Sequence, residues 1–106
     1  MKQGLFVTIV ATFMITVAAK GDWITNWMHT GEYPQAIAIN VQTNKIYTAN
    51  WWNDNVTVID GATDSTLTVA AGSYPFTLAV NPVTNKIYVA NHGSNNVTVI
   101  DGFTND

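Results

Sequence analysis

The sequence repeats itself with a period of 41 residues, and this repeat limits the possible folds more than any other feature. Residues 33–65 align with 74–106 without a gap, and 19 of the 33 aligned positions are identical. The run NVTVIDG at 55–61 recurs unchanged at 96–102. Chance does not produce such agreement, so the repeat decides the fold.

Each period contains four short runs with β-strand character, at 36–40, 45–49, 56–59 and 66–70 in the first copy. These runs are apolar, β-branched or aromatic, and residues typical of turns separate them. No helical periodicity appears after residue 19. Four short strands in about 40 residues are typical of a β-propeller blade, whereas the coils of a β-helix, the competing repeat fold, are usually shorter. We therefore predict an all-β fold made of four-stranded antiparallel propeller blades.

The second repeat carries the motif NKIYVAN at 85–91, followed by VTVID at 97–101. This pattern resembles the YVTN-type β-propeller repeat, in which Tyr-Val-(Thr/Ala)-Asn is followed by a short loop and a Val-x-Val-Ile-Asp strand. The first copy departs mildly, with YTAN at 47–50. The resemblance covers 23–106 and implies a propeller of an exported, periplasmic or cell-surface protein. The family includes surface-layer proteins, binding proteins and a minority of enzymes, so it implies a fold more than a function.

The repeat frame also predicts how the blades are divided along the chain. Projected backwards, it places an outer blade strand at 23–29, a complete blade at 33–70 and a blade without its outer strand at 74–106. Two blades cannot close a ring alone, because propellers need roughly four to eight. We favour a fragment of a longer propeller. The alternative is a ring of three or four copies, each lending 23–29 to its neighbour.

The N-terminal residues predict an export signal. Lys2 gives a basic start, residues 5–19 are uncharged, and the small residues before Lys20 fit a signal peptide at 1–19 that is cleaved after Ala19. A helix of 15 residues reaches only about 22 Å, short of the roughly 30 Å hydrocarbon core, so a stable membrane span is disfavoured. An uncleaved anchor and a buried strand are the alternatives. We expect a secreted, periplasmic or cell-surface protein.

Composition excludes several classes of partner and chemistry. The chain has four lysines, no arginine, seven acidic residues and a formal net charge of −3. It therefore lacks the basic patch that nucleic acids and anionic membranes require. The absence of cysteine excludes disulfides, thiolate metal sites and cysteine nucleophiles.

The candidate binding residues are aromatic and lie in loops that a propeller places on one face. Trp51 and Trp52 fall between the second and third strands, where the second repeat has His92. The connections that contain Tyr33 and Tyr74 share this face. We predict that a protein or carbohydrate ligand binds to Trp51, Trp52, Tyr33, Tyr74 and His92. The alternative is that one or both tryptophans pack into the groove between blades.

We expect no catalytic residue, metal site or cofactor. Asp60 and Asp101 recur at one repeat position, where the aspartate is expected to hydrogen-bond the local backbone and the glycine after it to supply a positive φ. His29 and His92 are too few, and too far apart in the repeat frame, for a metal site. The sequence has no Gly-x-Ser-x-Gly motif and no glycine-rich phosphate loop.

The combined prediction is an exported β-propeller module that acts in binding or scaffolding at the cell envelope, with no catalysis of its own. One alternative is part of a propeller enzyme, lactonase-like or a dehydrogenase subunit, whose active-site residues lie in missing blades. Another is a surface-layer structural protein. Besides a ligand on the loop face, the expected partners are further propeller blades or other copies of the chain, because each blade would otherwise leave an apolar face in water.

Overall fold

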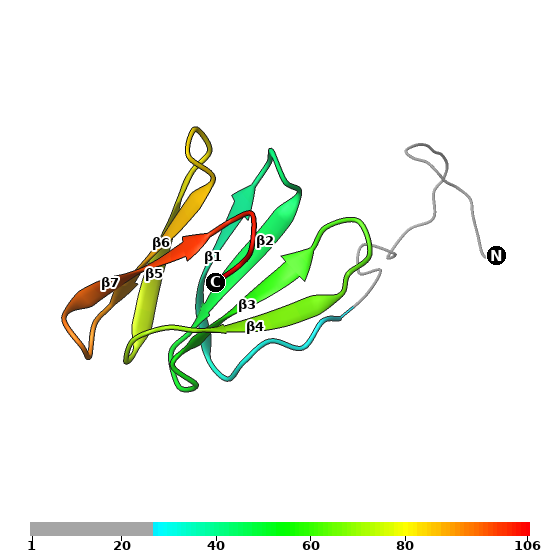
Figure 1. The fold of residues 1–106 in the computed structure, drawn as a ribbon. Coiled ribbons are helices and arrows are strands. Elements are labelled where there is room, and N and C mark those ends of the chain that lie inside the picture. The colour runs from blue at the N-terminus through cyan, green and yellow to red at the C-terminus, as the bar shows by residue number, and fades with distance from the viewer. Residues whose placement is uncertain (1–26) are drawn as a thin grey trace.

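The computed structural model describes residues 27–106, which form seven β-strands in two antiparallel sheets (Figure 1). The first sheet contains β1 (Pro34–Asn40), β2 (Lys45–Asn50), β3 (Asn55–Asp60) and β4 (Thr66–Ala70). The second contains β5 (Pro75–Asn81), β6 (Lys86–Asn91) and β7 (Asn96–Asp101). In each sheet the strands lie side by side in sequence order, and no helix occurs within the described residues. The predicted all-β fold class with blade-like sheets is confirmed.

Both sheets have the same register, because the repeat places the same residues at the same positions. Tyr47 pairs with Val58 in the first sheet, and Tyr88 pairs with Val99 in the second. The first strand of each repeat also has an irregularity just after its proline. Strand β1 begins at Pro34, two residues earlier than the predicted 36–40. Proline can occupy the first position of a strand, because no ladder hydrogen bond is lost there.

One residue in each connection between strands has left-handed backbone, as do one residue just before β1 and one after β7. These residues fall in pairs 41 residues apart, and most are Asn or Asp, whose short polar side chains tolerate this conformation. The pairs are Tyr33 and Tyr74, Asn44 and Asn85, Asp54 and Asn95, and Asp64 and Asn105. The repeat in sequence is therefore also a repeat in backbone conformation.

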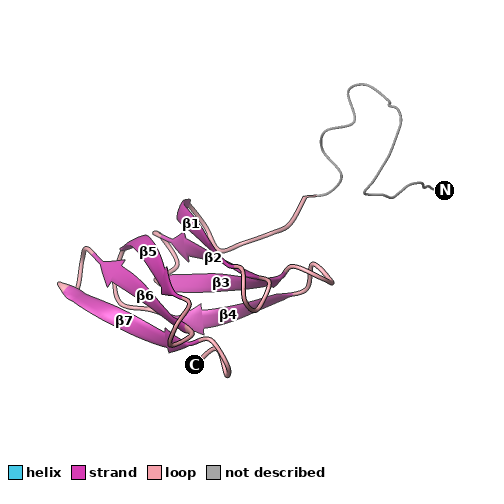
Figure 2. Cartoon of the chain, turned by 90° about the horizontal axis from the view of Figure 1, so that it is seen from above, coloured by secondary structure: helices cyan, strands magenta, loops and turns pink. Residues whose placement is uncertain are grey.

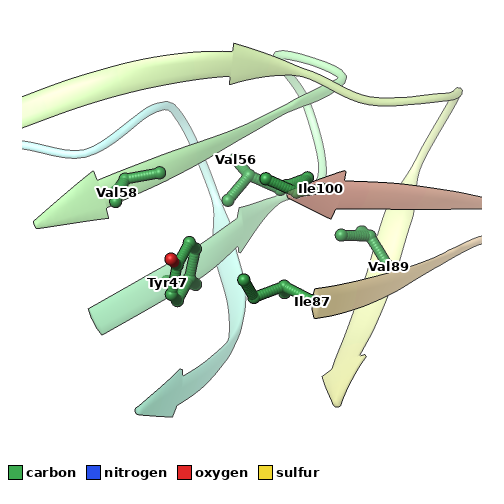
Figure 3. Packing of buried hydrophobic residues seen from close by; sticks show 6 residues of the cluster. All are labelled: Tyr47, Val56, Val58, Ile87, Val89 and Ile100. Atoms are coloured by element: carbon green, nitrogen blue, oxygen red, sulfur yellow. The ribbon is translucent and has the colours of Figure 1, made fainter. Parts of the chain in front are cut away.

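The hydrophobic core lies between the two sheets. Each sheet contributes three of its buried side chains (Figure 3): Tyr47, Val56 and Val58 from the first, and Ile87, Val89 and Ile100 from the second. Strands β1 and β2 lie against β5, and Figure 2 shows the two sheets next to each other from above. Removal of these apolar groups from water is the main force that holds the sheets together.

Two hydrogen bonds between side chains cross the same boundary. Asn40 Nδ2 donates to Asn85 Oδ1 at 2.6 Å, and the Tyr47 hydroxyl donates to Asn105 Oδ1 at 3.1 Å. Both Asn40 and Asn85 are buried, where an unpaired amide would be costly. Such directional contacts align the two sheets more strictly than an apolar core does alone.

Two of the sequence predictions concern the N-terminal segment. The predicted signal peptide, 1–19, lies outside the described residues. The predicted outer strand, 23–29, lies partly outside them; its described part, 27–29, is not in a strand, and no fourth strand from the described chain pairs with β7. Exchange of this strand between copies stays a prediction. Among residues 27–106, no helix is long and apolar enough to cross a membrane.

Candidate aromatic binding site

Hydrogen bonds hold the β2–β3 loop against the segment that precedes β1. The Trp51 N–H donates to the Tyr33 carbonyl at 2.9 Å, and the Trp52 N–H donates to the Glu32 carbonyl at 3.4 Å. The Glu32 N–H in turn donates to Asn53 Oδ1. The backbone therefore fixes the loop, so its aromatic side chains project from a defined position.

The second repeat has the same loop arrangement with different side chains. The His92 N–H donates to the Tyr74 carbonyl at 2.9 Å, and the Gly93 N–H donates to the Ser73 carbonyl at 2.9 Å. No tryptophan takes part in this second loop. The tandem tryptophans are therefore an addition to the repeat and not a requirement of its backbone.

All five predicted aromatic residues lie together, in a group that crosses from the first sheet to the second. The Trp51 ring stacks on Tyr74, with centroids 5.0 Å apart and planes at 17°, and on His92 at 5.7 Å and 24°. The Trp52 ring meets Tyr74 edge to face at 6.3 Å, and it meets Tyr33 in the same way at 6.2 Å. Stacked and perpendicular arrangements of this kind are favourable for aromatic pairs.

A sixth ring, Phe76, belongs to the same group and is absent from the sequence-based prediction. Its centroid lies 5.9 Å from that of Trp51 and 6.5 Å from that of His92. Phe76 lies in β5, so a search for aromatic residues in loops misses it. The repeat offers the available signal, since Phe76 stands where the first copy has Gln35. We call the six residues the aromatic cluster: Tyr33, Trp51, Trp52, Tyr74, Phe76 and His92.

The two tryptophans have different surroundings. Trp51 is partly buried among rings of the second sheet, so it packs into the groove between the sheets. Trp52 and Tyr33 are 58% and 57% exposed, and much of their rings is open to solvent. The Tyr74 N–H donates to Asp54 Oδ1 at 2.9 Å, which ties the loop of the first sheet to the second. The alternative that a tryptophan packs between the blades therefore applies to Trp51, whereas the Trp52 ring is open to a ligand.

Tyr33 and Tyr74 have an unfavourable backbone conformation. Their φ angles of 57° and 54° lie in the left-handed region, which is uncommon for bulky side chains. A residue of this kind costs on the order of 1–3 kcal/mol and persists only where its surroundings fix it. The carbonyls of both tyrosines accept loop hydrogen bonds, from Trp51 and His92 respectively, and these bonds supply part of that restraint.

Asp60 has the structural role that the sequence predicts. Its Oδ1 accepts a hydrogen bond from the Ala62 N–H at 2.8 Å, within the β3–β4 turn. This bond, assisted by the nearby Lys45 ammonium group, lowers the pKa of the Asp60 carboxyl below its ordinary value. In the second repeat Asp101 accepts from the Phe103 N–H at 2.9 Å. The recurring aspartate is therefore a turn-closing residue.

The prediction that the following glycine supplies a positive φ is wrong. Neither Gly61 nor Gly102 is in the left-handed region, and the positive φ in the first of these turns belongs to Asp64. Gly61 instead lies against the β1–β2 turn, where its N–H donates to the Asn44 carbonyl at 2.8 Å. A Cβ at Gly61 would lie 2.7 Å from that carbonyl oxygen. Glycine is needed here because two backbones approach closely.

The two histidines are exposed and belong to different parts of the chain. Within residues 27–106, no three His, Asp or Glu side chains are grouped so that they could hold a metal ion. His92 takes part in the aromatic cluster through its ring, which stacks on Trp51. Its contribution to this face is therefore an aromatic surface.

No protein-family model matches the chain, and no curated protein matches it. Among solved structures, the chain is similar to hydrazine synthase from Kuenenia stuttgartiensis, with a TM-score of 0.66 and 23% sequence identity. The match covers 84% of this chain and 25% of that one, so the chain spans about a quarter of the length of the protein that it matches. At this level of identity the likeness shows the fold alone, and it agrees with an all-β fold of two blade-like sheets.

Proposed function

We propose that this chain is an exported β-propeller module that acts in binding or scaffolding at the cell envelope, and that it binds a carbohydrate at the aromatic cluster. The observation that carries the proposal is the exposed ring pair of Trp52 and Tyr33, which hydrogen bonds hold on a fixed loop. Large rings kept open to solvent on a rigid support are typical of binding surfaces, because the entropy of ordering them is already lost before the ligand arrives.

Carbohydrate is favoured over protein as the ligand because polar groups border the exposed rings. Glu32 and Asn53 are both exposed beside Trp52 and Tyr33 along the chain. A sugar ring offers apolar C–H groups that stack on aromatic rings and hydroxyls that bond to such polar groups, a mixture typical of small-ligand sites. The net charge of −3 favours a neutral saccharide over an anionic one.

The export and family parts of the proposal rest on sequence. Residues 1–19 support export, and the motif at 85–101 supports membership of the YVTN-type repeat family. These two observations together support placement at the cell envelope. The alternatives of a propeller enzyme part and of a surface-layer protein stay predictions.

Calorimetric titration of the full chain with a panel of neutral oligosaccharides tests the carbohydrate proposal. Trp52→Ala is expected to weaken binding by at least about 10-fold, because an aromatic ring at the centre of a contact usually contributes more than 1.4 kcal/mol. Phe103→Ala is the matched control, since Phe103 is exposed and follows β7, at the other end of the strands from the aromatic cluster. The proposal is wrong if no saccharide binds or if both variants bind like the wild type; a protein ligand would then be tested next.

A further inference from the structure

Each sheet has two faces, and one face of each contributes to the core between the sheets. Paired residues on neighbouring strands share a face, so the strand register assigns every side chain. The face of the first sheet that points away from this core carries Ile37, Ile39, Ile46, Thr48, Thr57 and Ile59, and we call it free face 1. Ile37 and Ile39 are exposed on it, whereas Thr48, Thr57 and Ile59 are buried. The corresponding outer face of the second sheet carries Ala79, Tyr88, Ala90, Val97 and Val99, and we call it free face 2.

Free face 2 carries the repeat equivalents of side chains that form the core in the first sheet. Val97 and Val99 stand at the repeat positions of Val56 and Val58. The first two are 56% and 49% exposed, whereas their equivalents are 0% and 2% exposed. Identical residues on identical strands are thus core in one repeat and surface in the other, so free face 2 is suited to cover another sheet.

Free face 1 carries the repeat equivalents of side chains with which the second sheet contacts the core. Ile37 and Ile39 stand at the repeat positions of Leu78 and Val80, which pack against the buried core. The two isoleucines are 72% and 54% exposed. Neighbouring exposed aliphatic side chains of this kind indicate an interaction surface. At these two positions free face 1 therefore offers free face 2 the contact that Leu78 and Val80 offer the first sheet.

The first polar contact of the internal boundary has its counterpart on the two free surfaces. Inside the chain, Asn40 donates to Asn85. The equivalent of the donor is Asn81, next to free face 2, and the equivalent of the acceptor is Asn44, in the turn next to free face 1. The same amide-to-amide hydrogen bond is therefore available between two copies.

The second polar contact has a stronger counterpart. Inside the chain, the Tyr47 hydroxyl donates to Asn105. The equivalent of the donor is Tyr88, and the equivalent of the acceptor is Asp64, which has the same left-handed backbone as Asn105. A carboxylate accepts a hydroxyl proton more strongly than an amide oxygen does, so this contact is preserved or improved between copies.

A surface hollow beside His92 marks where a second copy would dock. The hollow is lined by Phe76, Ala90, Asn91, His92, Asn95, Asn96 and Val97. In the first repeat the equivalent place is occupied, because Trp51, the counterpart of His92, stacks on Tyr74. The counterpart of Tyr74 in another copy is Tyr33, which has the same backbone conformation and an exposed ring. Tyr74 is still 40% exposed in its place beside Trp51, so a docked Tyr33 keeps part of its ring open to a ligand.

We propose that free face 2 docks on free face 1 of a second copy of this chain, head to tail, with Tyr33 of the second copy filling the hollow beside His92. The two faces differ, so each docked pair leaves one of each kind free, and the assembly grows until a ring closes. Propellers of roughly four to eight blades correspond to two to four copies.

The segment before β1 lies beside part of free face 1. Trp27 and Met28 line a second hollow together with Ile37, Thr48 and Ile59. This part of free face 1 is therefore covered within the chain, and a second copy docks on the exposed part of the face, at Ile37 and Ile39.

Light scattering after size exclusion tests the proposal, with the chain expressed from its full sequence so that the host processes the N-terminal segment. The wild type is expected to be an oligomer. Val99→Asp disables free face 2 and Ile37→Asp disables free face 1, and each is expected to weaken association by at least about 100-fold, because each buries an unpaired carboxylate in an apolar contact. Val83→Asp is the matched control, since Val83 is 90% exposed in the β5–β6 turn and belongs to neither face.

Mixing the two variants distinguishes head-to-tail docking from other kinds of association. Each variant keeps one working face, so an equal mixture is expected to form a dimer with one chain of each kind. Circular dichroism is expected to show both variants folded, because both positions are about half exposed or more. A monomeric wild type, an oligomeric Val99→Asp variant, an Ile37→Asp variant that dimerises with itself or a mixture that stays monomeric would each overturn the proposal.

Discussion

Val58 and Val99 form a matched pair for measuring how much the core between the sheets stabilises the fold. Both lie in the sequence NVTVID, in the third strand of their own repeat. Val58 is 2% exposed and Val99 is 49% exposed. Substitution by alanine removes the same atoms from both, so the difference between the two losses in unfolding free energy reports burial and little else.

The structure predicts unequal losses. For Val58→Ala, two buried methyl groups at about 0.8 kcal/mol each account for about 1.6 kcal/mol, and the cavity left behind adds about 1 kcal/mol. The expected loss is therefore about 2–3 kcal/mol. For Val99→Ala, half of the side chain is already in water and the site is open, so the expected loss is about 0.8 kcal/mol or less.

Urea unfolding followed by tryptophan fluorescence measures both losses. The two substitutions are compared in the Ile37→Asp background, so that association between copies does not add to the effect at Val99. A difference of about 2 kcal/mol separates the two midpoints by roughly 1 M urea. Equal losses at unchanged m would refute the reasoning, because β7 would then be as deeply packed as β3.

Two further predictions concern the turns. Folding lowers the pKa of the Asp60 carboxyl below 3.8, chiefly through the Ala62 N–H, so its stabilisation is complete above that pH and is lost as the pH falls through the lowered pKa. In melting experiments between about pH 2 and about pH 6, Asp60→Asn should therefore lose less stability on acidification than the wild type, and parallel losses would contradict this. Gly61→Ala should cost at least about 1 kcal/mol in urea unfolding, because its Cβ would lie 2.7 Å from the Asn44 oxygen, and a neutral result would show that the turn can shift.

The fold was accessible from sequence because the residues that define it occur twice. The strand-forming runs and the left-handed turn residues, such as Asn44 and Asn85, keep the same spacing in both copies. The deviation at the start of β1 is local, because Tyr33 has left-handed backbone just before Pro34 and the register shifts between Pro34 and Ala36. Single-residue propensities do not indicate positive φ at a tyrosine before proline.

Features that depend on distant parts of the chain were not accessible in this way. The need for Gly61 comes from the Asn44 carbonyl, which another turn brings against it. Phe76 joins the aromatic cluster because the second sheet packs beside the loop that carries Trp51. Neither contact follows from local pattern, because each requires knowing how two strands or two sheets are placed in space.

The two repeats differ most where the aromatic cluster lies, and this difference separates binding from assembly. The loop at 51–54 reads WWND and its counterpart at 92–95 reads HGSN, although both keep the same backbone hydrogen bonds. Trp52 is therefore a residue that the repeat does not need, and its loss should affect a ligand and not the fold. Val99 is a residue that the repeat does need, yet in the second copy it faces solvent. A surface position that keeps a core residue is best explained by a partner sheet, so the two variants should lose different properties of the same molecule.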